Sequence, residues 1–211
     1  MNESLVWQSE LESRGIVCDP FWNHPDPFEG NFYHAYIAVH PEFSLGVRQT
    51  VADMLVAAQE KLPADWQLVL RAGYRPLAVQ RALFEAFRQD TAKKHPDWSS
   101  AAVLEYARTY VSDPASAISP HCTGGAVDVD VRSKSTDTLI DFGTPINTTS
   151  PKSHIDAKDL TPEQTANRKI LHDAMLSAGF APLASEWWHF QYGEQLWAAY
   201  YKQESPIYGI L

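Results

Sequence analysis

One alternating run of residues constrains the fold of this chain more than any other feature. After a Gly-Gly pair, residues 126–131 read AVDVDV, so that valines and aspartates alternate. A period of two is typical of a β-strand with one face in the core. The three valines therefore face the core, whereas Ala126, Asp128 and Asp130 share the opposite face. The two glycines allow a tight turn at the mouth of this strand.

Helical patterns account for four other segments. Apolar residues recur three or four positions apart in the first of them, and the last begins with a capping box of Thr161 and Gln164. The expected helices span residues 45–62, 76–94, 99–111 and 161–179. The expected strands span residues 33–39, 66–71, 125–131, 138–142 and 187–192.

This order of elements lacks the regular β-α-β alternation of a parallel sheet. We therefore expect an α+β fold, in which about four helices flank a mainly antiparallel central sheet. At 211 residues the chain suits a single domain spanning residues 1–211. Within it, the segment 19–30 carries three prolines and three aromatic residues, and we expect this ordered loop to cover the functional site.

The charge balance argues against two classes of partner. The formal net charge is -9 at pH 7, whereas nucleic acid and anionic membranes call for clustered Lys and Arg. No stretch approaches the roughly 18 uninterrupted apolar residues of a membrane span, and the acidic start lacks the pattern of a secretory signal. We therefore expect a cytoplasmic protein that binds neither nucleic acid nor membranes. Cys18 and Cys122 are expected to be reduced bystanders.

Two stretches carry residues that could bind a metal. In SPHCTGGAVD, the glycine turn lets His121 fold back toward Asp128. A histidine before such a turn is ordinarily a capping or solvent-facing group, so this stretch alone does not define a metal site. The stretch ASEWWHFQY adds Glu186 and His189 among aromatic side chains that would exclude water and lower the local dielectric constant.

Two imidazoles and one carboxylate suit a catalytic Zn²⁺ that keeps a fourth position for water. We therefore predict that His121, Asp128 and His189 bind one zinc ion per chain. Glu186 would stay free to take a proton from the bound water and pass it to a leaving amine. In isolation, EWWH is more often an aromatic core strand with a surface glutamate, so this prediction requires both stretches to meet in space.

Together the two stretches resemble a family of zinc peptidases that includes D-Ala-D-Ala dipeptidases and D,D-carboxypeptidases. SPHCTGGAVD matches the family motif S-x-H-x-x-G-x-A-x-D, and EWWH matches the motif E-x-x-H. The double tryptophan and the stretch GYRP (73–76) resemble the VanX-type dipeptidase branch. The similarity runs loosely over residues 18–192 and implies a hedgehog/D-Ala-D-Ala peptidase-like fold.

The resemblance implies roles for individual residues. It assigns zinc to the same three ligands and makes Glu186 the general base. Arg75 would stabilise the tetrahedral oxyanion, as a fixed cation does where negative charge develops, although Arg71 competes for this role. The residues that we expect at the substrate are Ser119, Asn147, Trp22 and Trp188.

Several positions depart from the family pattern. Ala72 stands where the family has an aspartate that can orient the arginine. Asn147 falls where the pattern leads to an aspartate that holds the substrate's ammonium group, and a neutral amide cannot supply the same charge-assisted bond. Trp22 and Pro27 differ in the N-terminal loop. We expect the chemistry to be kept, whereas the substrate is less firmly implied.

The sequence therefore predicts a zinc metallopeptidase that hydrolyses the amide bond of a small dipeptide, D-Ala-D-Ala or a related dipeptide with D-amino acids. A D,D- or L,D-carboxypeptidase acting on cell-wall peptides is the alternative of the same class. A zinc-stabilised binding module without turnover is the alternative of a different class, and the presence of Glu186 argues against it.

Overall fold

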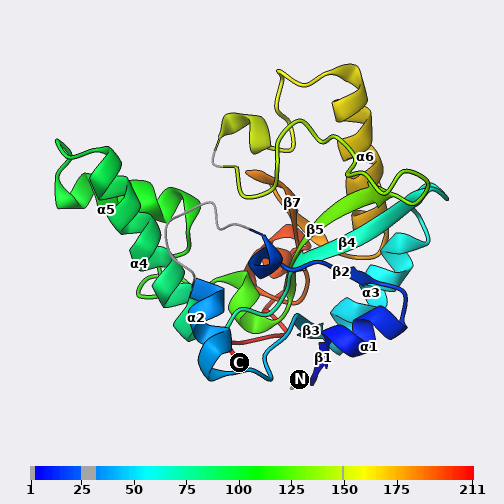
Figure 1. Ribbon diagram of the computed structural model, residues 1–211, viewed down its shortest axis with the longest axis horizontal. Helices are drawn as coiled ribbons and strands as arrows, with labels where there is room; N and C mark the ends of the chain where they lie inside the picture. Colours follow the sequence, from blue (N-terminus) through cyan, green and yellow to red (C-terminus); the bar gives the residue numbers. More distant parts are fainter. Residues whose placement is uncertain (1–2, 25–31, 149) are drawn as a thin grey trace.

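A five-stranded sheet organises the computed structural model, which describes residues 3–24, 32–148 and 150–211, without the side chains of Phe32 and Tyr33. The strand order is β2-β4-β5-β7-β6, and every neighbouring pair is antiparallel except β2 and β4 (Figure 1). The strands are β2 (Val17–Cys18), β4 (Trp66–Ala72), β5 (Ala126–Ser133), β6 (Ala181–Leu183) and β7 (Glu186–Gln191). The prediction of an α+β fold with a mainly antiparallel sheet is confirmed.

Helices surround this sheet. The four predicted helices correspond to α3 (Gln49–Gln59), α4 (Leu77–Lys94), α5 (Ser100–Tyr110) and α6 (Pro162–Ser177). The capping box of Thr161 and Gln164 at the start of α6 is formed as predicted. Three further helices are α1 (Gln8–Ser13), α2 (Phe32–Val39) and α7 (Gln195–Tyr200). Short 3₁₀ turns are η1 (Phe21–Asn23), η2 (Pro120–Thr123) and η3 (Pro151–Ser153).

The alternating run in β5 has the two faces that its sequence predicts. Val127, Val129 and Val131 are fully buried in the main apolar core, to which α3 and α6 also contribute buried side chains. Asp128 and Asp130 lie on the opposite face because successive strand residues alternate. The sheet thus separates an apolar core from a face that carries polar side chains.

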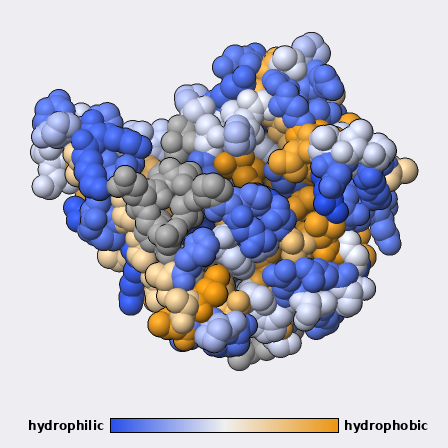
Figure 2. All heavy atoms as spheres, in the orientation of Figure 1, coloured by the Kyte–Doolittle hydropathy of each residue, from blue (hydrophilic) through white to orange (hydrophobic). Residues whose placement is uncertain are grey.

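The helices α4 and α5 form a hairpin that extends away from the sheet (Figure 1). A small separate cluster of Phe84, Phe87 and Ala107 holds the two helices together. The side of this hairpin that Figure 2 shows is mostly hydrophilic. Among the described residues, none of the helices has both the length and the apolar character needed to cross a membrane.

Two predicted strands were wrong, and one predicted helix starts later than expected. The segment 33–39 belongs to helix α2, because a short apolar run fits a helix as well as a strand and periodicity alone cannot decide between them. The segment 138–142 is a loop, because it pairs with β5 through a single isolated bridge at Leu139, whose side chain is 58% exposed. The predicted helix at 45–62 is confirmed from Gln49 onward as α3, whereas its first residues form strand β3 (Gly46–Arg48), which pairs with β1 (Leu5–Trp7).

The N-terminal loop 19–30 is described only in part. Residues 25–30, including Pro27, lie outside the described residues. In the described part, η1 brings Phe21 to the wall of a cavity that also contains His121 and Asp128. That the whole loop covers the site, and that residues 1–211 form one domain, stay predictions.

Candidate metal centre

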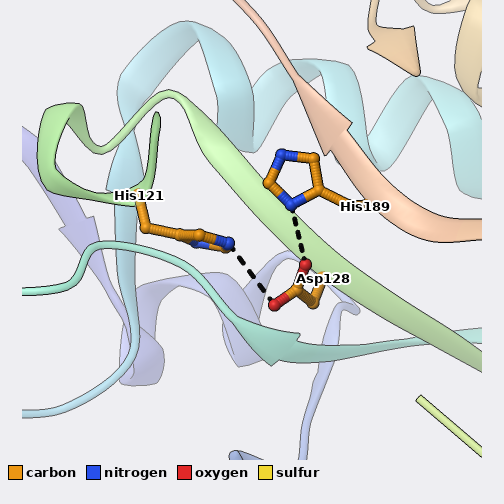
Figure 3. A group of neighbouring side chains, drawn as sticks. All are labelled: His121, Asp128 and His189. Atoms are coloured by element: carbon orange, nitrogen blue, oxygen red, sulfur yellow. Dashed lines mark hydrogen bonds and ion pairs between the residues drawn. The ribbon is translucent and has the colours of Figure 1, made fainter. Parts of the chain in front are cut away.

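Three buried side chains from distant parts of the chain meet on the polar face of the sheet. One nitrogen each of His121 and His189 and a carboxylate oxygen of Asp128 all lie within 4.8 Å of one another (Figure 3). Each of the three residues is at most 4% exposed. Within the described residues, this is the one group of three or more His, Cys, Asp or Glu side chains found to be arranged to hold a metal ion.

The sheet register fixes two of the three residues. Asp128 in β5 lies directly opposite His189 in β7, so both side chains project from the same face. On the other side of Asp128, its partner across the β4–β5 pair is Ala72. The short side chain of Ala72 therefore stands beside the cluster where the family pattern has an aspartate.

The third residue, His121, comes from the η2 turn that precedes β5. Gly124 ends this turn with a φ of 74°, a left-handed conformation that favours glycine. A Cβ on Gly125 would lie 2.3 Å from the backbone oxygen of Tyr192, so only glycine allows β5 to start this close to β7. The Gly-Gly pair folds His121 back toward Asp128 in the way that the sequence predicts.

The hydrogen bonds of His121 determine which ring nitrogen is available. Its Nδ1 lies 2.9 Å from the carbonyl oxygen of Gly73. Because a carbonyl oxygen only accepts, Nδ1 must carry the hydrogen and donate it. The Nε2 atom then presents its lone pair toward Asp128, whose Oδ2 is 3.4 Å away.

His189 has the complementary arrangement. Its Nε2 lies 3.0 Å from Oε1 of Gln191, an acceptor, which leaves Nδ1 facing Asp128 Oδ1 at 3.0 Å. An outer hydrogen bond that orients a ligating histidine is a common feature of protein metal sites. Gln191 was not among the residues predicted from the sequence. Its position two residues after His189, on the same strand face, is the signal that could have identified it.

The electrostatics of the cluster fit a divalent cation. Burial lowers the pKa of His121. For His189, burial opposes protonation, but the hydrogen bond to Asp128 raises its pKa. Burial would also raise the pKa of Asp128, but the charge and hydrogen bond of His121 hold it well below its usual range. A cation between these groups balances the buried carboxylate and leaves both imidazoles neutral, the form in which they bind metal.

Glu186 lies beside the cluster at the start of β7. One of its carboxylate oxygens is 3.9 Å from Nδ1 of His189, and the side chain lines the same cavity. Burial raises the pKa of Glu186 to about 7, which suits a group that both accepts and donates protons near neutral pH.

Arg75 reaches the cavity from the segment between β4 and α4. Its backbone N–H donates to the carbonyl oxygen of His121, and its Nη1 donates to Oε1 of Gln80 at 2.8 Å. Gln80 is 1% exposed and is itself held by the backbone oxygen of Ser112. Gln80, which the sequence analysis missed, thus orients Arg75 where Ala72 cannot.

The cavity over the cluster has a volume of about 290 Å³. Three of the residues predicted at the substrate, Ser119, Asn147 and Trp188, line it together with the cluster. Trp22 is placed differently: its ring packs against Phe43 at 5.6 Å between centroids and against the main core. Its neighbour Phe21 lines the cavity. The substrate roles of all four residues stay predictions.

Arg71, the competitor of Arg75, points elsewhere. It forms an ion pair with Asp19 and lines a second cavity. Two of the remaining histidines have other partners: His24 pairs with Asp19, and His95 stacks on Trp98. Neither cysteine is in a disulfide.

Comparison with known proteins identifies the class and then the family. The chain is a metallopeptidase of the M15 class: a family model described as D-ala-D-ala dipeptidase matches residues 13–207. The chain belongs to this D-Ala-D-Ala dipeptidase family, as its two sequence motifs predict. A D-alanyl-D-alanine dipeptidase of Streptomyces coelicolor is 30% identical over 92% of this chain and 94% of its own length.

Other relatives carry the same name. A D-alanyl-D-alanine dipeptidase of Synechocystis is 29% identical over 67% of this chain and 66% of its own length. Among solved structures, a variant of the vancomycin resistance D,D-pentapeptidase VanY, in complex with Zn(II), has a TM-score of 0.44 and 17% sequence identity. That alignment covers 78% of this chain and 83% of VanY.

Proposed function

We propose that this protein is a zinc-dependent dipeptidase that hydrolyses D-Ala-D-Ala or a related dipeptide containing D-amino acids. The observation that carries the proposal is the buried cluster in which His121 Nε2, Asp128 and His189 Nδ1 face one another. Membership of the D-Ala-D-Ala dipeptidase family and the names of the relatives support the substrate.

Zinc fits this cluster for chemical reasons. Two neutral imidazoles and a carboxylate are typical of catalytic zinc sites that leave one position open. When bound, zinc supplies a Lewis acid and lowers the pKa of a coordinated water to about 7. The hydrogen bonds of His121 to Gly73 and of His189 to Gln191 keep the two ring nitrogens in place for it.

Glu186 moves the proton in this reaction. Its carboxylate accepts a proton from the attacking water as the new C–O bond forms at the scissile carbonyl carbon. It then gives that proton to the amine nitrogen as the C–N bond breaks. One carboxylate can serve both steps because a pKa of about 7 lets Glu186 both accept and donate a proton near neutral pH.

Arg75 stabilises the charge that develops during the attack. The carbonyl oxygen becomes negative in the tetrahedral intermediate, and a fixed guanidinium beside it lowers the energy of that state more than the energy of the substrate. Because Gln80 and the backbone oxygen of His121 hold Arg75, this cation needs little reorganisation when the charge appears.

Ser119, Asn147, Trp188 and Trp22 are proposed to shape the substrate site. The first three line a cavity of about 290 Å³, which is at the small end of the range for ligand sites. A volume of this size favours a dipeptide over a long peptide directly above the cluster.

The experiment is a hydrolysis assay with a panel of L,L, L,D and D,D dipeptides, run on the wild type and on Glu186→Gln. We expect the wild type to cleave D-Ala-D-Ala best and Glu186→Gln to lose on the order of 10²- to 10⁴-fold in kcat, with one zinc per chain in both proteins. Failure of the zinc-loaded wild type to cleave any dipeptide would overturn the proposal.

A further inference from the structure

Two arginines line the cavity over the metal cluster, and the reaction proposed above uses only one of them. Arg75 is held beside His121 through its backbone N–H. Arg108 lies in the last turn of α5, on the helical hairpin that extends away from the sheet (Figure 1). Residues 108–112, at the end of α5 and the start of the next loop, all line this cavity together with the cluster. The second arginine therefore borders the space proposed for the substrate.

Asp113 holds the guanidinium group of Arg108 along one edge. Nε and Nη2 of Arg108 both donate to the same oxygen, Oδ2 of Asp113, at 3.0 and 2.8 Å. Asp113 is 7% exposed, and its Oδ1 accepts from the backbone N–H of Ala115. Within the described residues, Nη1 of Arg108 has no hydrogen-bond partner, and the side chain is 40% exposed. An oriented guanidinium group is thus left with donors that a ligand can use.

A chain of hydrogen bonds connects the two arginines. Nη1 of Arg75 donates to Oε1 of Gln80, whose Nε2 donates to the backbone oxygen of Ser112, each at 2.8 Å. The residue after Ser112 is Asp113, the partner of Arg108. Because each member of this chain is held by the next, the two guanidinium groups keep a fixed spacing. Such a pair suits a ligand that carries two oxygen-bearing groups at a fixed separation.

The acidic groups of the cavity lie at the metal cluster. Asp128 and Glu186 line the cavity, and their carboxylates approach Nδ1 of His189 to 3.0 and 3.9 Å. Asp113 offsets part of the charge of Arg108, but it is outside the described lining of the cavity. A carboxylate that enters the cavity therefore meets the guanidinium group of Arg108 and not its partner, whereas the two acids near His189 repel it.

We propose that Arg108 binds the terminal carboxylate of the substrate and so makes the enzyme specific for a free carboxyl terminus. The inference rests on the proposed function. The terminal carboxylate of a peptide is ionised at neutral pH, and the planar fork of a guanidinium group matches its geometry. A dipeptide bound in this way has its scissile carbonyl at Arg75 and its carboxylate one residue further on, at Arg108.

The test is a cycle of two substrates and two proteins. D-Ala-D-Ala and D-Ala-D-Ala amide, which lacks the carboxylate, are given to the wild type and to Arg108→Gln. Mass spectrometry measures cleavage of the bond between the two residues, and zinc content is measured in parallel. We expect the wild type to prefer D-Ala-D-Ala by about 10- to 100-fold in kcat/KM, the range for a hydrogen bond to a charged group, and Arg108→Gln to lose about ten-fold or more of that preference.

The outcomes separate this inference from the proposed function. A merely structural role for Arg108 would lower the rates for both substrates alike and leave the preference for D-Ala-D-Ala unchanged. That result, with D-Ala-D-Ala still cleaved by the wild type, would overturn the inference and leave the proposed function intact. No cleavage of either substrate by the zinc-loaded wild type would overturn both.

Two further variants examine the charge and its place. Arg108→Lys keeps a cation at this position and should recover part of the preference. Arg88→Gln is the matched control, because Arg88 lies on α4 of the same hairpin and donates to Glu85 through Nε and Nη2, with a side chain that is 37% exposed. It is outside the described lining of the cavity and should keep the wild-type preference. An equal loss in Arg88→Gln and Arg108→Gln would show that the effect does not arise in the cavity, and the inference would fail.

Discussion

The two faces of strand β5 differ in what they contribute to the protein. Val127, Val129 and Val131 are fully buried in the apolar core. Asp128 and Asp130 on the other face stand beside two cavities, with His189 and Trp187 as their neighbours from β7. One face of β5 thus stabilises the fold through buried valines, and the other face presents the aspartates to the cavities.

Alternation along one strand therefore places a rigid site directly behind a packed core. Because the core packing fixes the backbone of β5, the carboxylate of Asp128 has little freedom to move. This separation of roles would be contradicted by a variant on the polar face that mainly destabilises the fold, or by one on the apolar face that mainly changes the chemistry.

The largest effect is expected for Asp128→Asn. The neutral amide removes the carboxylate charge from the proposed ligand set, so zinc content falls and kcat/KM drops by on the order of 10³-fold or more. Asp137→Asn, at an exposed carboxylate paired with Arg132, is the control and should behave as the wild type. Full zinc content together with near-normal activity in Asp128→Asn would contradict the role of the polar face in metal binding.

The next effect concerns the oriented arginine. Arg75→Ala should lower kcat by about 10²- to 10³-fold, because it removes the cation at the developing charge. Gln80→Leu should lower kcat less, by about ten-fold, because Arg75 is kept but loses its orienting acceptor. Steady-state kinetics with zinc content measured in parallel checks both. A larger loss in Gln80→Leu than in Arg75→Ala would contradict this assignment.

On the apolar face, Val129→Ala should act on stability. Loss of two buried methyl groups lowers the free energy of unfolding by about 2 kcal/mol. Since Val129 touches the core and not the cavities, zinc content and kcat per folded molecule should stay near the wild type. Urea unfolding measures the first quantity. A large fall in kcat at unchanged stability would show that the two faces are not separate.

A smaller effect is expected at the wall shared by the two cavities. Asn147→Asp places a carboxylate beside the substrate's ammonium group, and a charge-assisted bond should lower KM for D-Ala-D-Ala by about ten-fold. N-acetyl-D-Ala-D-Ala, which has no ammonium group, is the matched substrate control and should not gain. An equal gain for both substrates would rule out an ammonium contact at residue 147.

The last prediction leaves catalysis untouched and concerns the thiol of Cys18 in β2, which packs against the core. Burial raises the pKa of this thiol to about 12. Because only the thiolate reacts, alkylation by iodoacetamide at pH 8 should be about 10³-fold slower than for a free thiol. Mass spectrometry of the native protein measures the rate, with the urea-unfolded protein as control. Equal rates in the two states would contradict the burial of Cys18.

Much of the metal cluster could be predicted from the sequence because its determinants are local. Alternation placed Asp128 opposite the core-facing valines, and the glycine pair explained how His121 returns toward it. The fold class followed from the order of elements. The strand proposed at 33–39 failed because a short apolar run does not distinguish a strand from a helix.

The supporting residues could not be predicted in the same way, because they depend on which segments meet in space. Gly73 accepts from His121 across 48 residues, and Gln80 meets Arg75 only because α4 starts directly after the arginine's turn. The second cavity requires the irregularity at Arg71, which no periodic pattern in β4 reveals.

The most direct test of the proposed zinc site is anomalous X-ray diffraction at the zinc edge, from crystals of protein purified without chelators. We expect one peak per chain, about 2.0–2.2 Å from His121 Nε2, Asp128 and His189 Nδ1. An active protein whose zinc lies elsewhere, or that contains no metal among these three side chains, would contradict it.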